Sequence, residues 1–438
     1  MKNLLLSIFF LSSFQFAIAN KVLVTSSSDD VSNPTFGMLR YFIYNSSNGD
    51  TIMFNVPNVN LLTKIDIITS VVIDGGKEMV TIDGGYNDQL FNVIAYNSST
   101  TISIKNLKLI NGKIISDNAW GGAMKVITGD VSGGKAIVEN CIFYNNEAFA
   151  FHDGQGGALY SKGLAGVFIN CSFFNNKLSG TADLQEGGAV MAWGGTFINC
   201  VFSGNQAKNV GGVYAHPDAQ FFNCTFAGNR ATASNSVGGI QSDKAYFENC
   251  IAFNNYANST SKNINAINFS SIKNCAIEST NALVGLNGNI GLNTSPFRGG
   301  SDDDSLSLVQ GSPCIDAGTS DLLAWPTDIL GNKRIAGAKI DMGAYEYGSA
   351  PIAAGIFTSV VQKEPVLYPN PSKGTVYLNQ EILQNGIFSI EVFDLLGKLI
   401  LVQNDMDESC MLLIEEQGIF QVKIRSNNTV YFQKIVIE

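Results

Sequence analysis

The sequence Val-Glu-Asn-Cys-Ile-Phe at residues 138–143 is one copy of a phrase that returns through the middle of the chain. In each clear copy an apolar residue lies two positions before the asparagine of Asn-Cys, and an apolar residue follows the cysteine by two. Further copies begin at residues 168, 197, 221 and 247, and related copies begin at residues 104 and 272. Successive cysteines are 30, 29, 24, 26 and 25 residues apart. A period of this length predicts a solenoid, in which each repeat forms one stacked coil.

The spacing inside the phrase predicts where the chain bends. Val138 and Cys141 are three positions apart, so strict strand alternation would place them on opposite faces. Both can face one interior if the chain turns at Asn140, because asparagine tolerates the left-handed backbone region. A second corner is marked by the trailing asparagines Asn146, Asn176, Asn205, Asn229 and Asn255. A third strand follows the Gly-Gly pairs at residues 121, 156, 187, 211 and 238. About three short strands per coil are typical of a parallel β-helix.

In such a coil each position stacks on its equivalent at about 4.8 Å. We therefore expect an amide ladder of Asn140, Asn170, Asn199, Asn223, Asn249 and Asn274, and a thiol ladder of Cys141, Cys171, Cys200, Cys224, Cys250 and Cys275. A disulfide needs Cβ atoms about 3.8 Å apart with converging bonds, which parallel neighbours do not provide. The sequence also lacks CxxC and Cys/His spacings typical of metal sites. Free, buried cysteines that behave as small apolar residues are the prediction.

The overall charge limits the class of partner. The chain has 438 residues, with 27 lysines and arginines against 37 aspartates and glutamates, and a net charge of −10. This balance argues against nucleic acid and anionic membrane surfaces.

Residues 1–19 have the pattern of a secretory signal peptide. Lys2 supplies a positive start, residues 4–16 an apolar core, and Ala17-Ile18-Ala19 a small-x-small cleavage site. No later stretch is long and apolar enough for a transmembrane helix. We expect the mature chain to leave the cytoplasm.

Residues 20–300 are predicted to form the β-helix with an N-terminal cap. Residues 36–43 have helix-like apolar spacing after Asn33-Pro34 and suit a lid over the first coil. The Leu-Arg, Gly-Asp-Thr-Ile and Ile-Asp-Gly-Gly segments at residues 39, 49 and 82 resemble the opening of many bacterial right-handed β-helix proteins. The Gly-Gly-Ala and Phe-x-x-Asn phrases also resemble the repeats of polymorphic outer-membrane proteins. These resemblances imply an all-β, right-handed parallel β-helix.

The repeat spacing fails from Asn281, and residues 301–347 are predicted to form a separate module. Gly-Ser-Pro-Cys-Ile-Asp-Ala-Gly at residues 311–318 is followed by Asp328, Gly331, Arg334 and an Ile-Asp-x-Gly-Ala-Tyr-Glu phrase at residues 340–346. This series resembles the choice-of-anchor Q domain, which implies a closing module for the β-helix of an exported protein.

Residues 348–365 read as a linker, and residues 366–438 as a separate domain. About seven alternating strands there predict a small immunoglobulin-like β-sandwich. Its Tyr-Pro-Asn-Pro, Asp-x-x-Gly-Lys and Gly-Ile-Phe phrases resemble the type A sorting domain of the type IX secretion system. The residues that carry this resemblance are Tyr368, Pro369, Asn370, Pro371, Gly397, Lys398 and Gly418. The resemblance implies contact with that secretion machinery, followed by release or attachment at the cell surface.

One group of residues on neighbouring coils is a candidate glycan site. Stacking would bring six of them to one groove, where tryptophan offers a face to a sugar ring: His152, Asp153, Glu186, Trp193, His216 and Asp218. The alternative is that they are loop residues without a role. The run at residues 302–304, three consecutive aspartates, could bind Ca²⁺ or form a solvated turn. No other cofactor is expected, and no residue is assigned a catalytic role.

Two functions remain open. The chain has only two histidines, neither in a Gly-His-Gly phrase, and its outward repeat positions carry mostly Ser, Thr, Asn and Gly. We therefore expect a noncatalytic exported protein, an adhesin or a platform for glycans or proteins. The alternative is a polysaccharide lyase or related carbohydrate-active enzyme, which needs a basic residue beside a carboxylate or neutralising group. A cleft with several carboxylates and a lysine or arginine would favour the enzyme.

Overall fold

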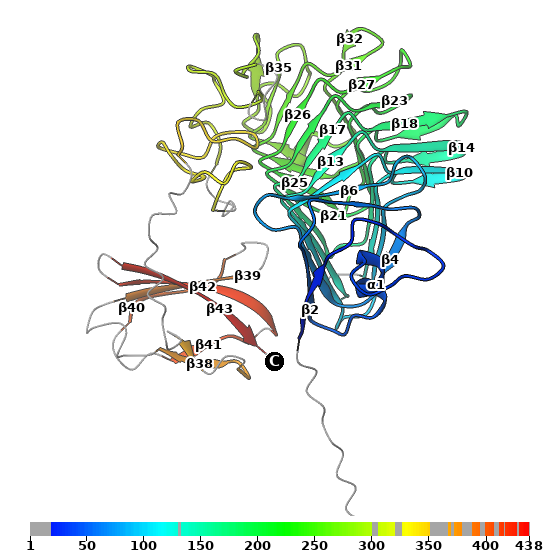
Figure 1. The fold of residues 1–438 in the computed structure, drawn as a ribbon. Coiled ribbons are helices and arrows are strands. Elements are labelled where there is room, and N and C mark those ends of the chain that lie inside the picture. The colour runs from blue at the N-terminus through cyan, green and yellow to red at the C-terminus, as the bar shows by residue number, and fades with distance from the viewer. Residues whose placement is uncertain are drawn as a thin grey trace, which may run out of the picture.

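The computed structural model describes residues 19–129, 133–299, 305–319 and 326–350, and the following parts of the C-terminal region: 367–368, 372–378, 388–394, 399–406, 411–415, 417–426 and 429–437. The chain up to residue 292 winds into a coil whose strands form four sheets, here named A to D (Figure 1). The strands pair in parallel, except for the hairpin of the last two strands of sheet D.

Sheets A and B each have ten strands. Sheet A contains β1 (Lys21–Val24), β2 (Asp50–Phe54), β5 (Val71–Asp74), β8 (Thr101–Lys105), β12 (Lys135–Glu139), β16 (Gly166–Ile169), β21 (Gly195–Ile198), β25 (Ala219–Phe222), β29 (Tyr246–Glu248) and β34 (Ile272–Lys273). Sheet B contains β3 (Asn58–Asn60), β6 (Val80–Asp83), β9 (Leu107–Ile110), β13 (Ile142–Tyr144), β17 (Ser172–Phe174), β22 (Val201–Ser203), β26 (Thr225–Ala227), β30 (Ile251–Phe253), β35 (Ala276–Glu278) and β36 (Ile290–Leu292).

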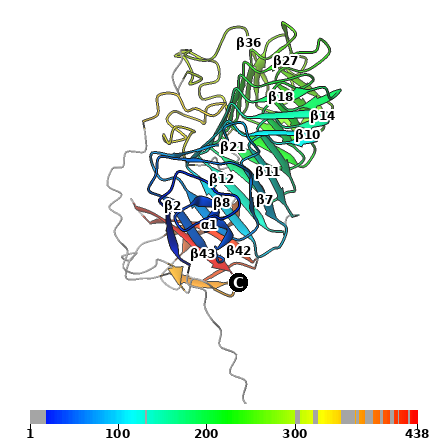
Figure 2. The same cartoon turned by 45° about the vertical axis from the view of Figure 1, so that its right-hand side comes forward.

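Sheets C and D each have eight strands. Sheet C contains β4 (Ile65–Ile67), β7 (Phe91–Ala95), β11 (Met124–Thr128), β15 (Leu159–Lys162), β20 (Val190–Ala192), β24 (Val213–Ala215), β28 (Ile240–Ser242) and β33 (Ile264–Ala266). Sheet D contains β10 (Lys113–Trp120), β14 (Glu147–Gln155), β18 (Lys177–Gly180), β19 (Leu184–Glu186), β23 (Gln206–Ala207), β27 (Arg230–Ala231), β31 (Tyr256–Ala257) and β32 (Thr260–Ser261). Figure 2 shows β7 and β11 of sheet C side by side.

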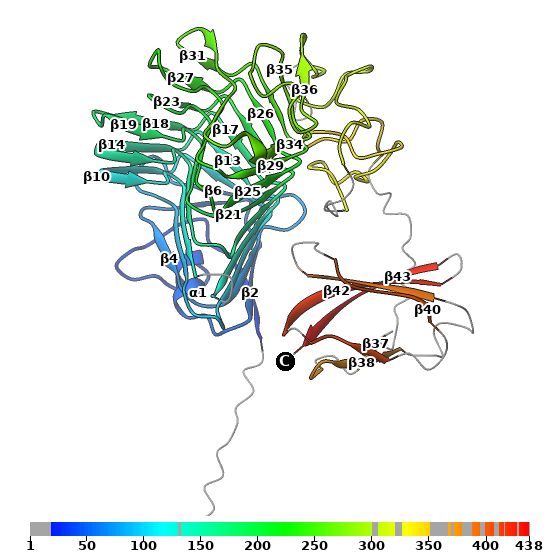
Figure 3. The same ribbon diagram turned by 180° about the vertical axis from the view of Figure 1, so that it is seen from behind.

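A full coil runs from sheet A through an asparagine corner to sheet B, out along sheet D, and back through a Gly-Gly corner to sheet C. Sheet D projects from the side of the coil (Figures 1 and 3). The crossover between parallel strands is right-handed in nearly all proteins. The predicted all-β, right-handed parallel β-helix is confirmed.

The asparagine corners have the left-handed backbone that the phrase predicts. The asparagine between sheets A and B has φ between 47° and 58° at residues 106, 140, 170, 199, 223, 249 and 274. The corner after sheet B is one residue earlier than the trailing asparagine. Asn145, Asn175 and Asn254 have positive φ there, and glycine takes the position in two coils, at Gly204 and Gly228.

The trailing asparagines form a continuous buried amide ladder. In Asn176, Asn205, Asn229 and Asn255 the carboxamide Oδ1 accepts hydrogen bonds from the backbone N–H and the Nδ2 of the equivalent asparagine in the previous coil, while Nδ2 also donates to a sheet B carbonyl of that coil. The ladder contains Asn146, Asn176, Asn205, Asn229 and Asn255 and continues to Asn263. These carboxamides therefore satisfy backbone groups that have no strand partner at the corner.

The first asparagine position makes a shorter ladder. Asn140, Asn170 and Asn199 each donate from Nδ2 to the equivalent Oδ1 in the previous coil, over 3.3, 3.1 and 3.1 Å. The Oδ1 atoms of Asn199 and Asn223 are buried without a partner among the described residues. Asn249 instead exchanges two hydrogen bonds of 2.9 Å with the backbone of Thr319. Asn274 donates to Glu248 at 3.5 Å. The downstream segment therefore interrupts the amide row.

Stacked aromatic rings and thiols fill the interior. Phe168, Phe197, Phe221 and Phe247 stack with centroids 4.5–4.7 Å apart, and a second row contains Phe143, Phe173, Phe202 and Phe226. The cysteines within the described part, Cys141, Cys171, Cys200, Cys224, Cys250, Cys275 and Cys314, are buried and free. Burial raises the pKa of the Cys141 thiol to about 12. Such thiols pack as small apolar groups.

A short helix covers the first coil. Helix α1 (Leu39–Tyr44) buries Leu39, Phe42 and Ile43 against the same core (Figure 1). The Arg40 guanidinium forms a buried ion pair with Asp29 at 2.6 Å and donates to two backbone carbonyls, of Thr63 and Lys64. At the other end, the 3₁₀ turn η1 (Phe269–Ser271) precedes β34, and Leu283 is buried in the core.

The segment expected to close the β-helix lies along its side. Leu308, Cys314 and Met342 pack on Ile251, Ala276 and Leu292, which belong to the strands of sheet B. Asn199 Nδ2 donates to the Thr327 carbonyl at 2.7 Å, across 128 residues of sequence. The described parts of residues 301–347 therefore cover the flank of sheet B, and their resemblance to a choice-of-anchor Q domain stays a prediction.

The C-terminal region contains two antiparallel sheets. One contains β37 (Leu367–Tyr368), β38 (Thr375–Leu378) and β41 (Met411–Leu413), and the other contains β39 (Phe388–Asp394), β40 (Leu399–Met406), β42 (Gly418–Ser426) and β43 (Thr429–Ile437). Both sheets contribute to one buried apolar cluster that includes Leu367, Val376, Ile390, Val422 and Ile435. This is a β-sandwich with its own core, and its immunoglobulin-like character stays a prediction.

Several predicted features lie partly or wholly outside the described residues. Of the sorting-signal residues, Tyr368 is in β37 and Gly418 begins β42, while Pro369, Asn370, Pro371, Gly397 and Lys398 lie outside the described part. The same holds for residues 1–18 of the predicted signal peptide, for most of the predicted linker and for the aspartates at 302–304. No helix within the described ranges is long and apolar enough to cross a membrane.

We predict that Asn205→Ala destabilises the β-helix strongly. The change leaves the Asn176 N–H and the Phe173 carbonyl without the side chain that bonds them, and it removes one of the two donors to Asn229 Oδ1. Unsatisfied buried groups cost about 1–3 kcal/mol each, so a loss of about 2–4 kcal/mol is expected after relaxation. Urea unfolding followed by circular dichroism measures it. The control is Asn265→Ala, an exposed asparagine of β33 with one side-chain hydrogen bond, and an equal effect of both changes would contradict the role of the ladder.

Candidate functional site

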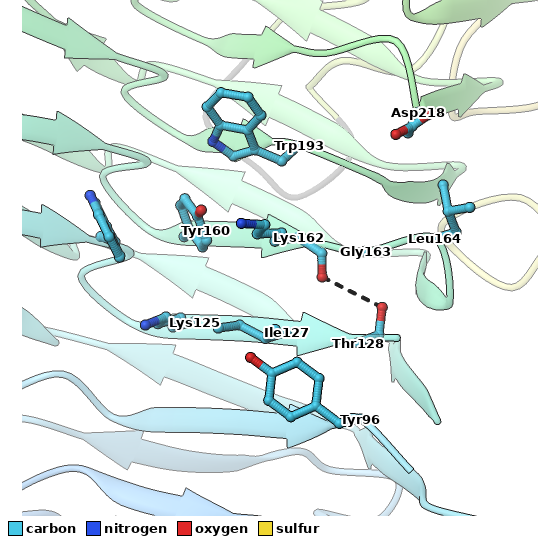
Figure 4. Close-up of a pocket in the computed structure, with 11 residues that line it drawn as sticks. Tyr96, Lys125, Ile127, Thr128, Tyr160, Lys162, Gly163, Leu164, Trp193 and Asp218 are labelled. Atoms are coloured by element: carbon cyan, nitrogen blue, oxygen red, sulfur yellow. Dashed lines mark hydrogen bonds between the residues drawn. The ribbon is translucent and has the colours of Figure 1, made fainter. Parts of the chain in front are cut away.

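A half-open groove of about 520 Å³ runs over the outer face of sheet C (Figure 4). Its residues come from strands β11 and β15, from the end of β10, and from the segments that follow β7, β15, β20 and β24. The groove is lined by Tyr96, Trp120, Lys125, Ile127, Thr128, Tyr160, Lys162, Gly163, Leu164, Trp193 and Asp218. Figure 4 shows Lys125 and Lys162 between Tyr96 at one end and Trp193 at the other.

Strand register explains why these side chains share one surface. Lys125 lies opposite Tyr160, and Ile127 lies opposite Lys162. The intervening residues Met124, Val126 and Leu159 face the core, so their neighbours face outward. Because each coil places the same position one strand spacing above the last, residues about 35 positions apart in sequence become neighbours.

An aromatic wall borders the groove on the side of sheet D. Trp120 and Tyr160 stack with centroids 5.3 Å apart and an interplanar angle of 15°. The Lys125 ammonium lies 5.0 Å from the Trp120 ring centroid, within the range of a cation–π contact. Trp120 Nε1 donates to Asp153 Oδ2 at 3.4 Å, which helps to hold the indole in this orientation.

The two lysines are cationic groups without an ion-pair partner. Neither forms a salt bridge with any residue that the structure describes. The pKa of Lys125 is lowered by burial and then by the charges of Lys64 and Lys162. Burial also raises the pKa of the Tyr160 hydroxyl, with Asp153 adding to the effect. This part of the groove therefore combines aromatic surface with two lysines that have no ion-pair partner among the described residues.

The next coils continue the groove with an aromatic pair. Trp193 stacks on His216 with ring centroids 3.5 Å apart and an interplanar angle of 10°. Trp193 Nε1 donates to Gln155 Oε1 at 2.9 Å, and Gln155 Nε2 donates to Asp153 at 3.0 Å. Burial lowers the pKa of His216, so its ring is largely neutral near pH 7. Trp193 is held from two sides while about a third of its surface, 37%, stays exposed.

Carboxylates gather beside this aromatic pair. Glu186 lies next to Gln155 in the strand register, and burial followed by the charges of Asp153 and Asp243 raises its pKa to about 7. Asp243 accepts a hydrogen bond of 2.7 Å from the Tyr214 hydroxyl. Burial and this bond raise the pKa of Tyr214. This end of the surface is therefore acidic.

Of the six residues predicted as a glycan site, some line the groove, some lie beside it, and one does neither. Trp193 and Asp218 line the groove, while Asp153, Glu186 and His216 adjoin it. His152 is exposed on β14 next to Asp153 and is not among the lining residues.

The sequence analysis missed Trp120, Lys125, Tyr160 and Lys162. A signal for two of them was available, since Lys125 and Tyr160 hold the same place after successive Gly-Gly corners. Trp120 immediately precedes such a corner. Within the described ranges, no group of three or more histidine, cysteine, aspartate or glutamate side chains is arranged to hold a metal ion.

Comparison with known proteins identifies the C-terminal region. A family model described as "Secretion system C-terminal sorting domain" matches residues 366–438. Among solved structures, the chain is similar to pectate lyase Pel9A, with 14% identity, a TM-score of 0.32, and coverage of 75% of this chain and 96% of that chain. It is also similar to jun a 1, the major allergen from cedar pollen, with 18% identity, a TM-score of 0.30, and coverage of 63% and 77%. No curated protein matches. The two structural similarities are too low to carry an argument about the groove.

We predict that Glu186→Gln changes how stability depends on pH. The pKa of Glu186 rises from 4.5 to about 7 on folding, so its contribution to stability is present below about pH 4.5 and is lost as the pH rises through about 7. Glutamine does not ionise, so the variant should gain thermal stability over the wild type at pH 8 and little at pH 5. Burial also raises the pKa of Glu346 to about 7. Because Glu346 is present in both proteins, its effect on stability cancels in the comparison. Parallel curves of melting temperature against pH would contradict the assignment.

Proposed function

We propose that this protein is a type IX secretion cargo whose β-helix serves, without catalysis, as a glycan-binding platform or adhesin at the cell surface or in the medium. The groove over sheet C is the proposed binding site. Its exposed aromatic rings and unpaired lysines are the observation that carries the proposal. A protein is the other class of ligand that we propose for this surface.

The C-terminal region indicates export. The sorting-domain match covers residues 366–438, and domains of this kind direct cargo to the cell surface or the medium. The sandwich has its own apolar cluster, separate from the cluster inside the β-helix. The separate core supports a role of the sandwich as a sorting signal rather than as part of the binding surface.

The groove supports glycan binding through three kinds of group. Tyr96 and Trp193 expose 61% and 37% of their surfaces, so both offer aromatic surface to a sugar, while His216 covers one face of Trp193. Lys125 and Lys162 supply donors to hydroxyl or acidic groups. The hydrogen bonds from Trp120 and Trp193 fix both indoles before a ligand arrives, which reduces the entropy lost on binding.

A polysaccharide lyase is the second candidate, favoured by one observation. Lyases of acidic polysaccharides need a base that removes the proton next to a carboxylate. The lowered pKa of Lys125 makes its neutral, basic form more accessible, and Lys162 lies close enough to neutralise a substrate carboxylate. Ultraviolet absorbance of the unsaturated product, measured on acidic polysaccharides with the wild type and Lys125→Ala, decides between the two candidates.

We predict that Tyr96→Ala and Trp193→Ala weaken binding to glycans selected on a glycan array by about three- to tenfold each, because each removes an aromatic face worth about 0.5–1.5 kcal/mol. Isothermal titration calorimetry measures the loss. Tyr144→Ala is the matched control, because Tyr144 is 44% exposed but belongs to sheet B. Array binding that is absent, or unaffected by both groove variants, would refute the proposed site.

We predict that deleting residues 366–438 leaves the β-helix folded but abolishes its delivery to the surface or medium of the native host. The separate apolar clusters mean that the deletion removes no part of the β-helix core. Circular dichroism of the truncated protein and its distribution between periplasm, surface and medium measure the two effects. In the reciprocal experiment, residues 366–438 should export a reporter that carries a signal peptide. Normal export of the truncated protein would contradict the sorting role.

A further inference from the structure

Charge changes sign along the groove. Lys162, Trp193, His216 and Asp243 occupy the same position in four consecutive coils, because each of the last three donates its backbone N–H to the coil below, to Ser161, Ala192 and Ala215. With about 4.8 Å per coil, roughly 14 Å separates the positions of Lys162 and Asp243. The surface therefore runs from cationic, through aromatic and neutral, to acidic within the length of a short oligosaccharide.

The cationic end suits one acidic group. Lys125 and Lys162 lie on adjacent strands, displaced by two residues, and their mutual repulsion helps to lower the pKa of Lys125. A carboxylate or sulfate between them would relieve that repulsion and accept hydrogen bonds from both ammonium groups. The Trp120 ring beside them, supported from behind by the buried Tyr160 ring, offers apolar surface to the sugar that carries the acid.

The adjoining coils suit a neutral sugar and oppose a second acid. The Trp193–His216 stack presents ring surface, and His216 is largely neutral near pH 7. Asp218 lines this part of the groove, and Asp153, Glu186 and Asp243 lie next to it. An acidic group on the next sugar would meet these carboxylates at short range, which disfavours a uniformly charged polymer.

We infer that the groove selects heteropolysaccharides in which an acidic sugar is followed by a neutral one, over homopolymers of acidic sugars and over wholly neutral glycans. This inference rests on the proposed glycan-binding function and specifies its ligand class. The acid binds between Lys125 and Lys162, and the neutral sugar lies on the Trp193–His216 stack.

Three hexasaccharides of equal length test the selectivity in calorimetric titrations with the full-length protein. They are an alternating glucuronate–N-acetylglucosamine hexamer, an oligogalacturonate hexamer and a neutral mannohexaose. The alternating hexamer should bind at least about tenfold more tightly than either of the others, as expected for charge-assisted hydrogen bonds without opposing carboxylates. Its affinity should also fall with added salt, whereas that of the neutral hexamer should not.

Charge variants connect the selectivity to the residues. Lys125→Gln and Lys162→Gln should each weaken the alternating hexamer about tenfold and leave the neutral hexamer unchanged. Lys108→Gln is the control, because Lys108 is exposed on β9 of sheet B, outside the groove. Asp218→Asn removes a carboxylate from the exposed lining and should raise the affinity for oligogalacturonate.

The outcomes separate this inference from the function on which it rests. Equal binding of oligogalacturonate and the alternating hexamer, or lysine variants that behave as the Lys108 control, would overturn the charge selectivity while glycan binding stands. Preferential binding of the neutral hexamer would overturn it as well. If none of the three hexamers binds, the inference about charge selectivity is overturned. The proposed glycan-binding function itself is overturned only if the protein binds no glycan on the array.

Discussion

The buried carboxamide ladder is the interaction on which the rest of the structure depends. Asn176 shows its geometry: Nδ2 donates to the Phe143 carbonyl in the previous coil and to Asn205 Oδ1 in the next, while its own Oδ1 accepts from Asn146. One side chain thus connects three coils at the point where the chain leaves sheet B. Strand pairing stops at this corner, so backbone groups there would otherwise be buried without partners. Alanine or leucine at these positions could fill the volume but could not satisfy those groups.

The same constraint creates the site. The ladder keeps the coils from Asn146 to Asn263 in register, so the outward positions of sheet C in these coils align as vertical columns. Chain inserted between the ladder and the Gly-Gly corner does not disturb this register, because both ends of the insertion are fixed. The long strands β10 and β14 are such insertions, and they bring Trp120 and Gln155 to the edge of sheet C. The groove is therefore built from variable segments on a fixed frame, which is a common way to carry function on a rigid scaffold.

This division explains what the sequence could and could not predict. The coil, the left-handed corners and the interior rows repeat because the same backbone geometry needs the same residue in every coil, and a repeated phrase is visible in a single sequence. Lys125 and Lys162 lie two positions apart in register, so no phrase connects them. Trp193 and His216 were predictable as neighbours because they occupy the same place in two coils. The flank formed by residues 305–319 and 326–347 was not, because its contacts, such as that of Asn199 with Thr327, cross 128 residues without any periodic signal.

The inner face of sheet C belongs to the core, and its outer face carries the proposed binding groove. This difference has a consequence for the charge of the groove. The inward residues belong to the continuous apolar core, whereas the outward lysines form no ion pair within the described part of the chain. Adjacent cations repel one another, which offsets the favourable contact of Lys125 with Trp120, so substituting one of the lysines should cost the fold little. In a protein with a net charge of −10, two lysines that lie side by side between aromatic rings, without an ion pair in the described part of the chain, therefore support the proposed binding role of the groove.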